Sequence, residues 1–268
     1  MRTLVKACFA ATALCSTYVP AAEPEPAAPA WTVSGTLTAA SDYRFRGLTQ
    51  TQGRPVLQGS FDASHASGWY VGLFGSGVSH AAYNNGSGTE FDVYGGYRHT
   101  WAEGRSVDAG VVTYWYPGAR YQLPGERIDY NTQEAKLAVN VGTVNVTGWV
   151  GLSEHWFGFA SDPFTGSQVA TRGTSYIEAN WSPEIGSGLV LNLHAGHQRL
   201  RHLPDYDFTD VKVGVTKSWK SWSVSIAALY NNGAREKAGA PLWTFFDADG
   251  RGKHVAGSSF VVTASQTF

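Results

Sequence analysis

Apolar and polar residues alternate with a period of two along most of the chain from Trp31 onward. In residues 31–39 the odd positions are apolar or small and the even positions are polar. The pattern continues after Ser41 through residues 42–46, where charged residues take the even positions and aromatic residues the odd ones. Strict alternation of this length predicts a β-strand with one apolar face and one wet face. We therefore expect the first strand to cover residues 31–46.

The same alternation recurs often enough to predict twelve strands. Some of the segments are short, but each pairs an apolar set with a polar set. The expected strands lie around residues 31–46, 57–63, 69–73, 91–97, 107–111, 135–141, 144–152, 177–181, 189–193, 211–215, 222–226 and 260–268.

The connections between these strands differ in length according to their order. Connections after odd-numbered strands are mostly long, and those after even-numbered strands are compact. The long set is 47–54, 79–88, 117–129, 156–172, 232–257 and the shorter 199–204; the compact set is 65–68, 101–105, 142–143, 183–188 and 217–221. Short periplasmic turns and long extracellular loops alternate in this way in outer-membrane barrels. The sequence thus predicts an all-β, transmembrane, antiparallel up-and-down β-barrel of about 12 strands.

Composition narrows the class of protein further. The chain has 20 Lys and Arg residues against 21 Asp and Glu, so it lacks the basic excess of a protein that binds nucleic acid by neutralising phosphates. No apolar run reaches the roughly 18 residues of a transmembrane helix. Alternation, however, can conceal a membrane-facing surface within a sequence of moderate hydropathy.

The first 30 residues have the features of an export signal. Arg2 and Lys6 precede a short apolar stretch at 7–14, and small or apolar residues follow at 19–21. We expect residues 1–22 to be a cleaved signal peptide, 23–30 a flexible lead-in rich in Pro, Ala and Glu, and 31–268 the barrel. The alternatives are a buried N-terminal helix or lipidation at Cys15. Both cysteines, Cys8 and Cys15, lie in the predicted signal, so we expect no disulfide and no Cys-based cofactor or metal site in the mature chain.

Aromatic residues gather where the predicted strands meet their connections. Such rings settle at the headgroup level of a membrane and form two girdles around a barrel. The alternative is that they are core residues of a soluble β protein. The expected girdle residues are Tyr43, Phe45, Trp69, Tyr97, Trp101, Trp115, Tyr116, Trp149, Trp156, Tyr176, Trp181, Trp219, Trp222 and Tyr230.

If the apolar positions face lipid, the alternate positions face the lumen. The candidate lumen-lining residues are Asp42, Arg44, Arg46, Asp62, Glu90, Asp92, Arg98, Asp108, Glu134, Lys136, Glu178, His194, Asp210 and Lys212. They could line a hydrated eyelet that selects solutes by size and charge, with an acidic excess that favours cations, or fill a narrow barrel with ion pairs. Arg44 and Arg46 could form a basic rung for a carboxylate or phosphate, but we favour ion pairs with Asp62 or Asp92.

Three stretches resemble the TorF-type porin family of proteobacterial outer-membrane proteins. They are Ser-Asp-Tyr-Arg-Phe-Arg-Gly at 41–47 with Thr49 and Gln50, Glu-Phe-Asp-Val-Tyr-Gly-Gly-Tyr at 90–97, and Tyr-Trp-Tyr-Pro-Gly at 114–118. The terminal Phe268 resembles the signal that the barrel-assembly machinery reads. Gln266 departs from that signal, which often has an apolar residue two positions before the last one. The resemblance implies an outer-membrane location and no catalytic residue to transfer.

Three functions follow from these observations. The first is passive diffusion of small hydrophilic solutes, with outer-membrane lipid and the assembly machinery as the other partners. The second is a non-conducting structural barrel, or one whose loops 156–172 and 232–257 bind a partner. The third is an outer-membrane lipid hydrolase that uses Ser153 and His155, which would share one strand face. No histidine pair has the spacing of a zinc site.

Overall fold

The computed structural model describes residues 30–101, 104–246 and 251–268. The predicted signal peptide at 1–22 lies outside the described residues, as does the lead-in at 23–30 except Ala30.

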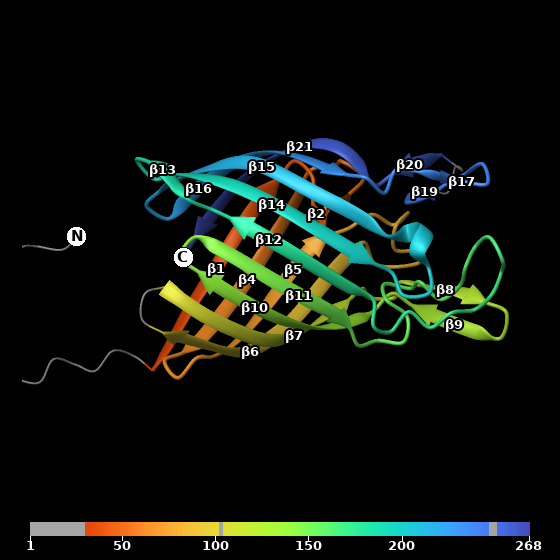
Figure 1. Ribbon diagram of the computed structural model, residues 1–268, viewed down its shortest axis with the longest axis horizontal. Helices are drawn as coiled ribbons and strands as arrows, with labels where there is room; N and C mark the ends of the chain where they lie inside the picture. Colours follow the sequence, from red (N-terminus) through yellow and green to blue (C-terminus); the bar gives the residue numbers. More distant parts are fainter. Residues whose placement is uncertain (1–29, 102–103, 247–250) are drawn as a thin grey trace, which may run out of the picture.

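Within the described residues, twelve long strands form a closed antiparallel barrel (Figure 1). Each strand pairs with its neighbours in sequence, and the last strand pairs with the first, for example at Thr36 and Thr267. A short additional strand, β13 (Glu184–Gly186), lies beside β14. The prediction of about twelve antiparallel strands is confirmed. The barrel strands are β1 (Trp31–Ala40), β4 (Val56–His65), β5 (Trp69–Gly77), β6 (Thr89–Trp101), β7 (Arg105–Trp115), β10 (Thr132–Val141), β11 (Val144–Gly151), β12 (Ser175–Trp181), β14 (Leu189–Arg199), β15 (Phe208–Trp219), β16 (Trp222–Asn231) and β21 (Gly257–Thr267).

The two ends of the barrel differ. The short turns lie at one end, where β1 begins and β21 ends, and we call this the short-turn end. The long connections lie at the opposite end, on the right in Figure 1. They carry the small hairpins β8 (Arg120–Leu123) with β9 (Glu126–Asp129), β17 (Glu236–Lys237) with β18 (Ala240–Pro241), and β19 (Thr244–Phe246) with β20 (Gly252–His254).

The wall of the barrel is apolar outside and polar inside. Leu37, Phe61 and Val139 are exposed by 58%, 51% and 45% on the outer surface. Glu134 and Asp108, which point the other way, are exposed by only 0% and 2%. A soluble protein buries the opposite set, so this arrangement is the one expected of a barrel whose outer wall contacts hydrocarbon. Within the described ranges, the structure contains no helix with the length and hydropathy that a membrane-spanning helix needs.

Most of the buried apolar side chains lie among the long connections. Residues 78–88, 116–131, 152–174, 200–207, 232–246 and 251–256 pack over the barrel, and we call them the cap. One cluster includes Leu203 and Trp243, and a second includes Tyr83 and Tyr116. The long connections therefore form a packed layer with its own apolar core.

The first strand ends earlier than predicted. β1 stops at Ala40, and the chain then turns into a hairpin of β2 (Arg44–Phe45) and β3 (Leu48–Thr49) that lies inside the barrel. We call residues 42–53 the inner hairpin. The expected strand over 31–46 was wrong because a hairpin arm has the same period of two as a wall strand.

Candidate functional site in the barrel interior

The turn of the inner hairpin is held by backbone geometry and by the wall. Arg46 and Gly47 have φ values of +50° and +75°, the pair of left-handed conformations of a two-residue hairpin turn. A Cβ atom on Gly47 would lie 2.8 Å from Cβ of Asp210 on β15 and 3.1 Å from Cβ of Asn231 on β16. Asn231 also donates a hydrogen bond to the Arg46 carbonyl oxygen at 2.9 Å. The turn thus presses against the wall with no room for a side chain at Gly47.

Asp42 organises the base of the inner hairpin. Its Oδ1 accepts hydrogen bonds from the hydroxyls of Thr49 and Thr51, at 2.5 and 2.7 Å, and from the backbone N–H of Gly53 at 3.1 Å. Its Oδ2 pairs with Nε of Arg44. Because a carboxylate has lone pairs for several donors, this one side chain ties both arms of the hairpin together.

An ion pair fastens the tip of the hairpin to the wall. The Arg46 guanidinium donates to Oε2 and Oε1 of Glu134 on β10, at 2.6 and 3.0 Å, and to Oε1 of Gln198 on β14 at 2.8 Å. Glu134 also accepts from the Trp156 indole N–H at 2.8 Å and from the Tyr114 hydroxyl at 3.1 Å. A buried bidentate pair is favoured when other donors also bond its carboxylate, as Trp156 and Tyr114 bond Glu134 here.

Aromatic rings enclose the Arg46 guanidinium. Its Cζ lies 4.4 Å from the ring centroid of Tyr176 and 4.7 Å from that of Phe45. Burial lowers the pKa of Arg46, but the charge and hydrogen bond of Glu134, with smaller contributions from Tyr114 and Tyr176, raise it overall, so the guanidinium stays charged. The tip of the hairpin therefore carries a permanent charge that is paired and shielded from water.

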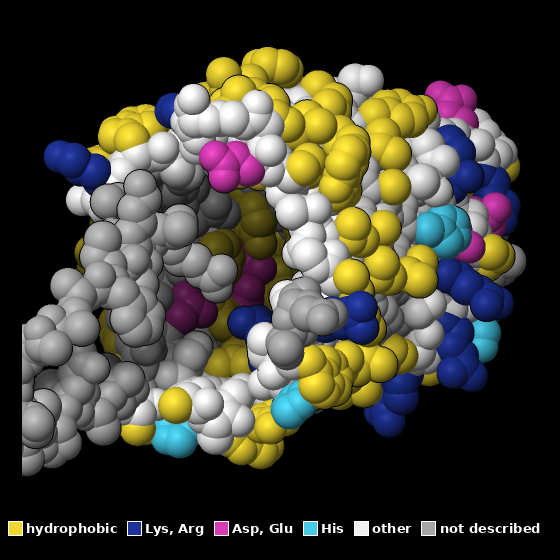
Figure 2. Space-filling view, turned by 60° about the vertical axis from the view of Figure 1, so that its left-hand side comes forward, with side chains coloured by type: hydrophobic (Ala, Val, Ile, Leu, Met, Phe, Trp, Pro, Cys, Tyr) yellow, Lys and Arg dark blue, Asp and Glu magenta, His cyan; other side chains and the backbone are white. Residues whose placement is uncertain are grey.

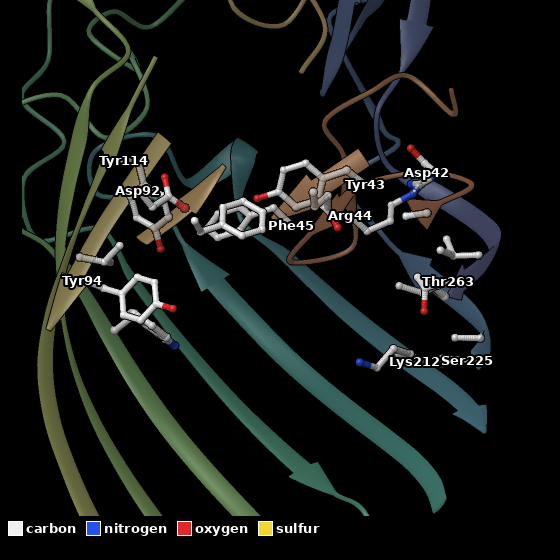
Figure 3. Close-up of a pocket in the computed structure, with 18 of the residues that line it drawn as sticks. Asp42, Tyr43, Arg44, Phe45, Asp92, Tyr94, Tyr114, Lys212, Ser225 and Thr263 are labelled. Carbon is white, nitrogen blue, oxygen red and sulfur yellow. Dashed lines mark hydrogen bonds and ion pairs between the residues drawn. The ribbon is translucent and has the colours of Figure 1, made fainter. Parts of the chain in front are cut away.

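A cavity of about 620 Å³ lies below the inner hairpin. Figure 3 shows Tyr43, Arg44 and Phe45 above this space, with Tyr94 and Lys212 on the wall below. We call it the barrel cavity. Figure 2, which brings the short-turn end forward, shows a hollow that holds acidic and basic side chains. The barrel interior is thus hollow and charged on this side of the hairpin.

Several charges on the wall form local networks. Asp108 accepts from Nη2 of Arg98 at 2.8 Å and from the Tyr70 hydroxyl at 2.7 Å, and Nζ of Lys136 lies 3.3 Å from its Oδ1.

A second network centres on Asp210 and His194. Nε2 of His194 lies 2.9 Å from Oδ2 of Asp210, and the Tyr176 hydroxyl donates to Oδ1 at 2.9 Å. Lys212 also lines the cavity and has no ion pair with another described residue. Lys212 therefore adds a basic group to the lining that is not in direct contact with a described carboxylate.

The fourteen candidate lumen residues lie on the inner face of the wall or in the inner hairpin. Arg98 is the most solvent-exposed of those in ion pairs, with 54% of its side chain accessible, yet it still binds Asp108. Contact of this set with a passing solute stays a prediction. The predicted ion pairs of Arg44 and Arg46 with Asp62 or Asp92 were wrong. The alternative, in which the two arginines form one basic rung, was wrong as well. Because the hairpin leaves the wall, Arg44 pairs with Asp42 and Arg46 with Glu134.

The expected girdle divides into an outer and an inner set. Trp69, Tyr97, Trp101, Trp115, Trp181, Trp219, Trp222 and Tyr230 are exposed. Tyr43, Phe45, Tyr116, Trp149, Trp156 and Tyr176 instead lie in the interior or the cap, where they line cavities or join buried clusters. Placing these six in a girdle was wrong. Trp149 and Tyr176 occupy the inward positions of their strands, whereas the other four belong to the hairpin or the cap.

Three neutral residues of the barrel interior are not identified from the sequence. Gln198 and Asn231 are fully buried and hold the hairpin tip, and Tyr114 binds Glu134. From the sequence, only charged positions and one histidine are assigned to the lumen. The parity of the strand, applied to every polar residue, could have found these three side chains.

The two residues considered for a hydrolase, Ser153 and His155, lie just after β11, at the end of the barrel that carries the long connections. The Ser153 hydroxyl oxygen accepts a hydrogen bond from the backbone N–H of Gln133 at 2.7 Å. Within the described part of the chain, no hydrogen bond joins Ser153 to His155, so the nucleophile and base are not paired. Over the same ranges, no group of three or more His, Cys, Asp or Glu residues is placed to hold a metal ion.

A family model described as "Bacterial protein of unknown function (Gcw_chp)" matches residues 23–268. The chain belongs to the Gcw_chp family. No curated protein matches it. Among solved structures, this Gcw_chp chain is similar to the NanC porin, with 10% identity, 87% of this chain and 98% of that chain covered, and a TM-score of 0.53.

A second solved structure that is similar to the Gcw_chp chain is titled "KdgM porin in complex with disordered oligogalacturonate". The two chains are 8% identical, the match covers 88% of this chain and 98% of the KdgM chain, and the TM-score is 0.50. At such low identity the likeness to KdgM and NanC concerns the fold alone.

Proposed function

We propose that this chain is a TorF-type porin of the outer membrane through which small hydrophilic solutes diffuse passively. One observation carries the proposal: a closed barrel wall is apolar outside and surrounds a hollow lined by charged side chains. Hydrocarbon contact explains the outer face, and a hydrated path explains the inner one. The shared fold with the NanC and KdgM porins supports the same function.

In this channel the inner hairpin forms the constriction. The barrel cavity lies on its short-turn side, a second cavity of about 330 Å³ lies on its cap side, and Phe45 lines both. The hairpin is held by hydrogen bonds and one ion pair, so a solute has to pass beside it or displace it. We expect a low conductance set by this segment.

The export and assembly features belong to the same proposal. Residues 1–22 would direct export and be cleaved, and Phe268 would be read by the barrel-assembly machinery. In support, the backbone N–H and C=O of Phe268 both pair with Gly35 on β1, while its ring is 70% exposed. The terminal residue thus closes the barrel and leaves its side chain accessible.

Conductance across a planar lipid bilayer tests the proposal. The purified, folded barrel should give stepwise current increases in potassium chloride, and these should be absent when the same detergent is added without protein. A heat-modifiable band on an electrophoresis gel establishes that the barrel is folded. A folded barrel that never conducts, over a wide range of voltage and salt, would overturn the proposal.

A further inference from the structure

The cavity on the cap side of the inner hairpin has the form of a binding pocket. It measures about 330 Å³ and is lined by the inner hairpin and by residues from every segment of the cap. We call it the cap cavity. Pro163 at its rim is exposed, whereas Trp156 and Trp243 deeper inside are exposed by only 2% and 5%. The cavity therefore runs from the surface into the apolar core of the cap.

The chemistry of the cap cavity differs from that of the barrel cavity. None of the described residues that line it is Asp, Glu, Lys, Arg or His, whereas the barrel cavity is lined by Asp42, Arg44, Asp92, Lys136 and Lys212. A charged ligand would lose its hydration in the cap cavity without gaining an opposite charge. The lining therefore favours an uncharged ligand.

Most of the polar atoms around the cap cavity are already engaged. The indole N–H of Trp156 donates to Glu134, and that of Trp243 donates to the Tyr206 carbonyl oxygen at 3.1 Å. The Tyr83 hydroxyl donates to Gln50 and the Tyr121 hydroxyl to the Gly158 carbonyl, both at 2.6 Å.

Two further hydroxyls complete the polar groups of the aromatic lining. The Tyr130 hydroxyl accepts from Asn84 at 3.2 Å. The Tyr206 hydroxyl makes no hydrogen bond to another described residue. The cavity thus offers mainly ring faces and edges, with Tyr206 as an available hydrogen-bonding group.

The aromatic lining is packed into a fixed arrangement. The ring of Phe159 lies with its centroid 5.3 Å from that of Trp243, 5.4 Å from that of Tyr206 and 6.0 Å from that of Trp156. Rings held at such distances support one another and provide a rigid apolar surface. A pocket that is already formed binds without the cost of ordering its side chains.

The volume limits the size of the ligand. A buried apolar cavity of roughly 150 Å³ accepts benzene, and small-molecule sites begin at about 300 Å³. At about 330 Å³ the cap cavity accommodates a molecule of two fused rings.

We propose that the cap cavity binds an uncharged, flat, mostly apolar molecule of about two rings, packed against Phe159 and Trp243 and hydrogen-bonded by the Tyr206 hydroxyl. This goes beyond passive diffusion of hydrophilic solutes, because it adds a selective site above the inner hairpin. It does not depend on conduction.

Isothermal titration of the intact folded barrel with coumarin tests the site. Coumarin is neutral, has two fused rings and carries a carbonyl acceptor for Tyr206. We expect saturable binding, at least tenfold weaker binding of coumarin-3-carboxylate, and no detectable binding of cellobiose, a neutral sugar of comparable size. Titration into micelles without protein corrects for partitioning into detergent.

Matched variants localise the binding. Phe159→Ala should weaken coumarin binding at least tenfold, and Tyr206→Phe, which removes one hydroxyl, about threefold. Phe246→Ala, in the cap but outside the cavity, should leave the affinity unchanged. If Phe159→Ala does not give a heat-modifiable barrel, Phe159→Leu keeps an apolar side chain but removes the flat ring.

Several outcomes would overturn the site. They are no saturable binding by the folded barrel, equal affinity for coumarin and its carboxylate, tighter binding of cellobiose, or equal losses in the Phe159 and Phe246 variants. Because current is not measured, binding by a barrel that fails to conduct refutes the channel alone. Conduction by a barrel that fails to bind refutes the cap site alone.

Discussion

Single residues hold the inner hairpin in place, and Arg46 contacts three separate strands of the wall. Its guanidinium reaches β10 and β14, while its carbonyl oxygen is bound from β16. Gly47 beside it meets β15 and β16. The hairpin tip is therefore fixed to four wall strands through two adjacent residues.

Arg46→Ala should release the hairpin and raise the conductance several-fold. The substitution leaves Glu134 buried without its counter-ion, so we expect a loss of about 3–5 kcal/mol in unfolding free energy. Chemical unfolding and bilayer recordings measure the two effects. The double variant Arg46→Gln with Glu134→Gln should recover part of the stability because no buried charge remains.

Arg98→Ala is the matched control for the ion pair. Arg98 is largely exposed, and Asp108 would still have Lys136 nearby, so the loss should stay within about 1 kcal/mol. An equal loss in the Arg46 and Arg98 variants would contradict the role given to the buried pair.

Gly47→Ala should destabilise the barrel more than Gly142→Ala. Both glycines have positive φ, +75° and +59°, so both variants lose about 1–2 kcal/mol from backbone strain. Of the two glycines, only Gly47 has wall atoms within 4 Å of the position of the added methyl group. Overpacking at this position should increase the loss of unfolding free energy by about 1–3 kcal/mol. Chemical unfolding of the two variants measures the difference, and equal losses would show that the tip does not press on the wall.

At the scale of elements, the inner hairpin separates the two cavities. β2 and β3 are only two residues each, and contacts of the inner hairpin with the wall and the cap hold them in place. The Tyr43 hydroxyl donates a hydrogen bond to Glu90 on the wall at 3.2 Å. The backbone N–H of Thr49 and the guanidinium of Arg44 both donate to the backbone carbonyl oxygen of Val255 in the cap. The hairpin is thus held by hydrogen bonds to both the cap and the wall.

Replacing residues 44–49 by two glycines should join the cavities. We expect a conductance several-fold above that of the wild type and faster uptake of small sugars into liposomes. Removing four residues, 123–126, from the tip of the β8–β9 hairpin is the control, because this tip lines neither cavity. An unchanged conductance in the first variant would show that the constriction lies elsewhere.

The elements differ in how far the sequence predicts them. Alternation determines the wall strands because each strand has lipid-like and wet faces, as at Leu37 and Thr38 or Leu137 and Lys136. The inner hairpin has the same period, so only its contacts with Glu134 and Gln198 distinguish it from a strand. The cap clusters were not predicted because they join residues far apart in the chain, such as Phe159 and Trp243.

At the scale of the whole molecule, the outer wall is the largest apolar surface. Leu57, Trp69 and Phe260 are exposed by 77%, 60% and 66%. A surface of this kind is stable only against hydrocarbon or a partner. We therefore expect the barrel to tolerate polar substitution at its ends but not in its middle.

Leu137→Arg should reduce the yield of folded barrel in lipid vesicles. Leu137 lies in the middle of β10 and is 57% exposed, and an arginine there costs about 2–4 kcal/mol in the bilayer centre. Gln133→Arg, on the same face near the long-loop end, should cost about 0–1 kcal/mol. Electrophoretic heat-modifiability measures the folded fraction. Equal yields would show that the middle of the wall does not contact hydrocarbon.

The pairing of β1 with β21 has a consequence for biogenesis. Thr36 and Thr267 are partners although they lie 231 positions apart in the sequence, and the pairing of their two strands closes the barrel. A chain that is exported as proposed above carries two unpaired strand edges until β21 has paired with β1, and such edges readily join other chains. On that proposed route, periplasmic chaperones would have to shield both edges during this interval, and the long-range pairing of β1 with β21 would be a slow step of folding.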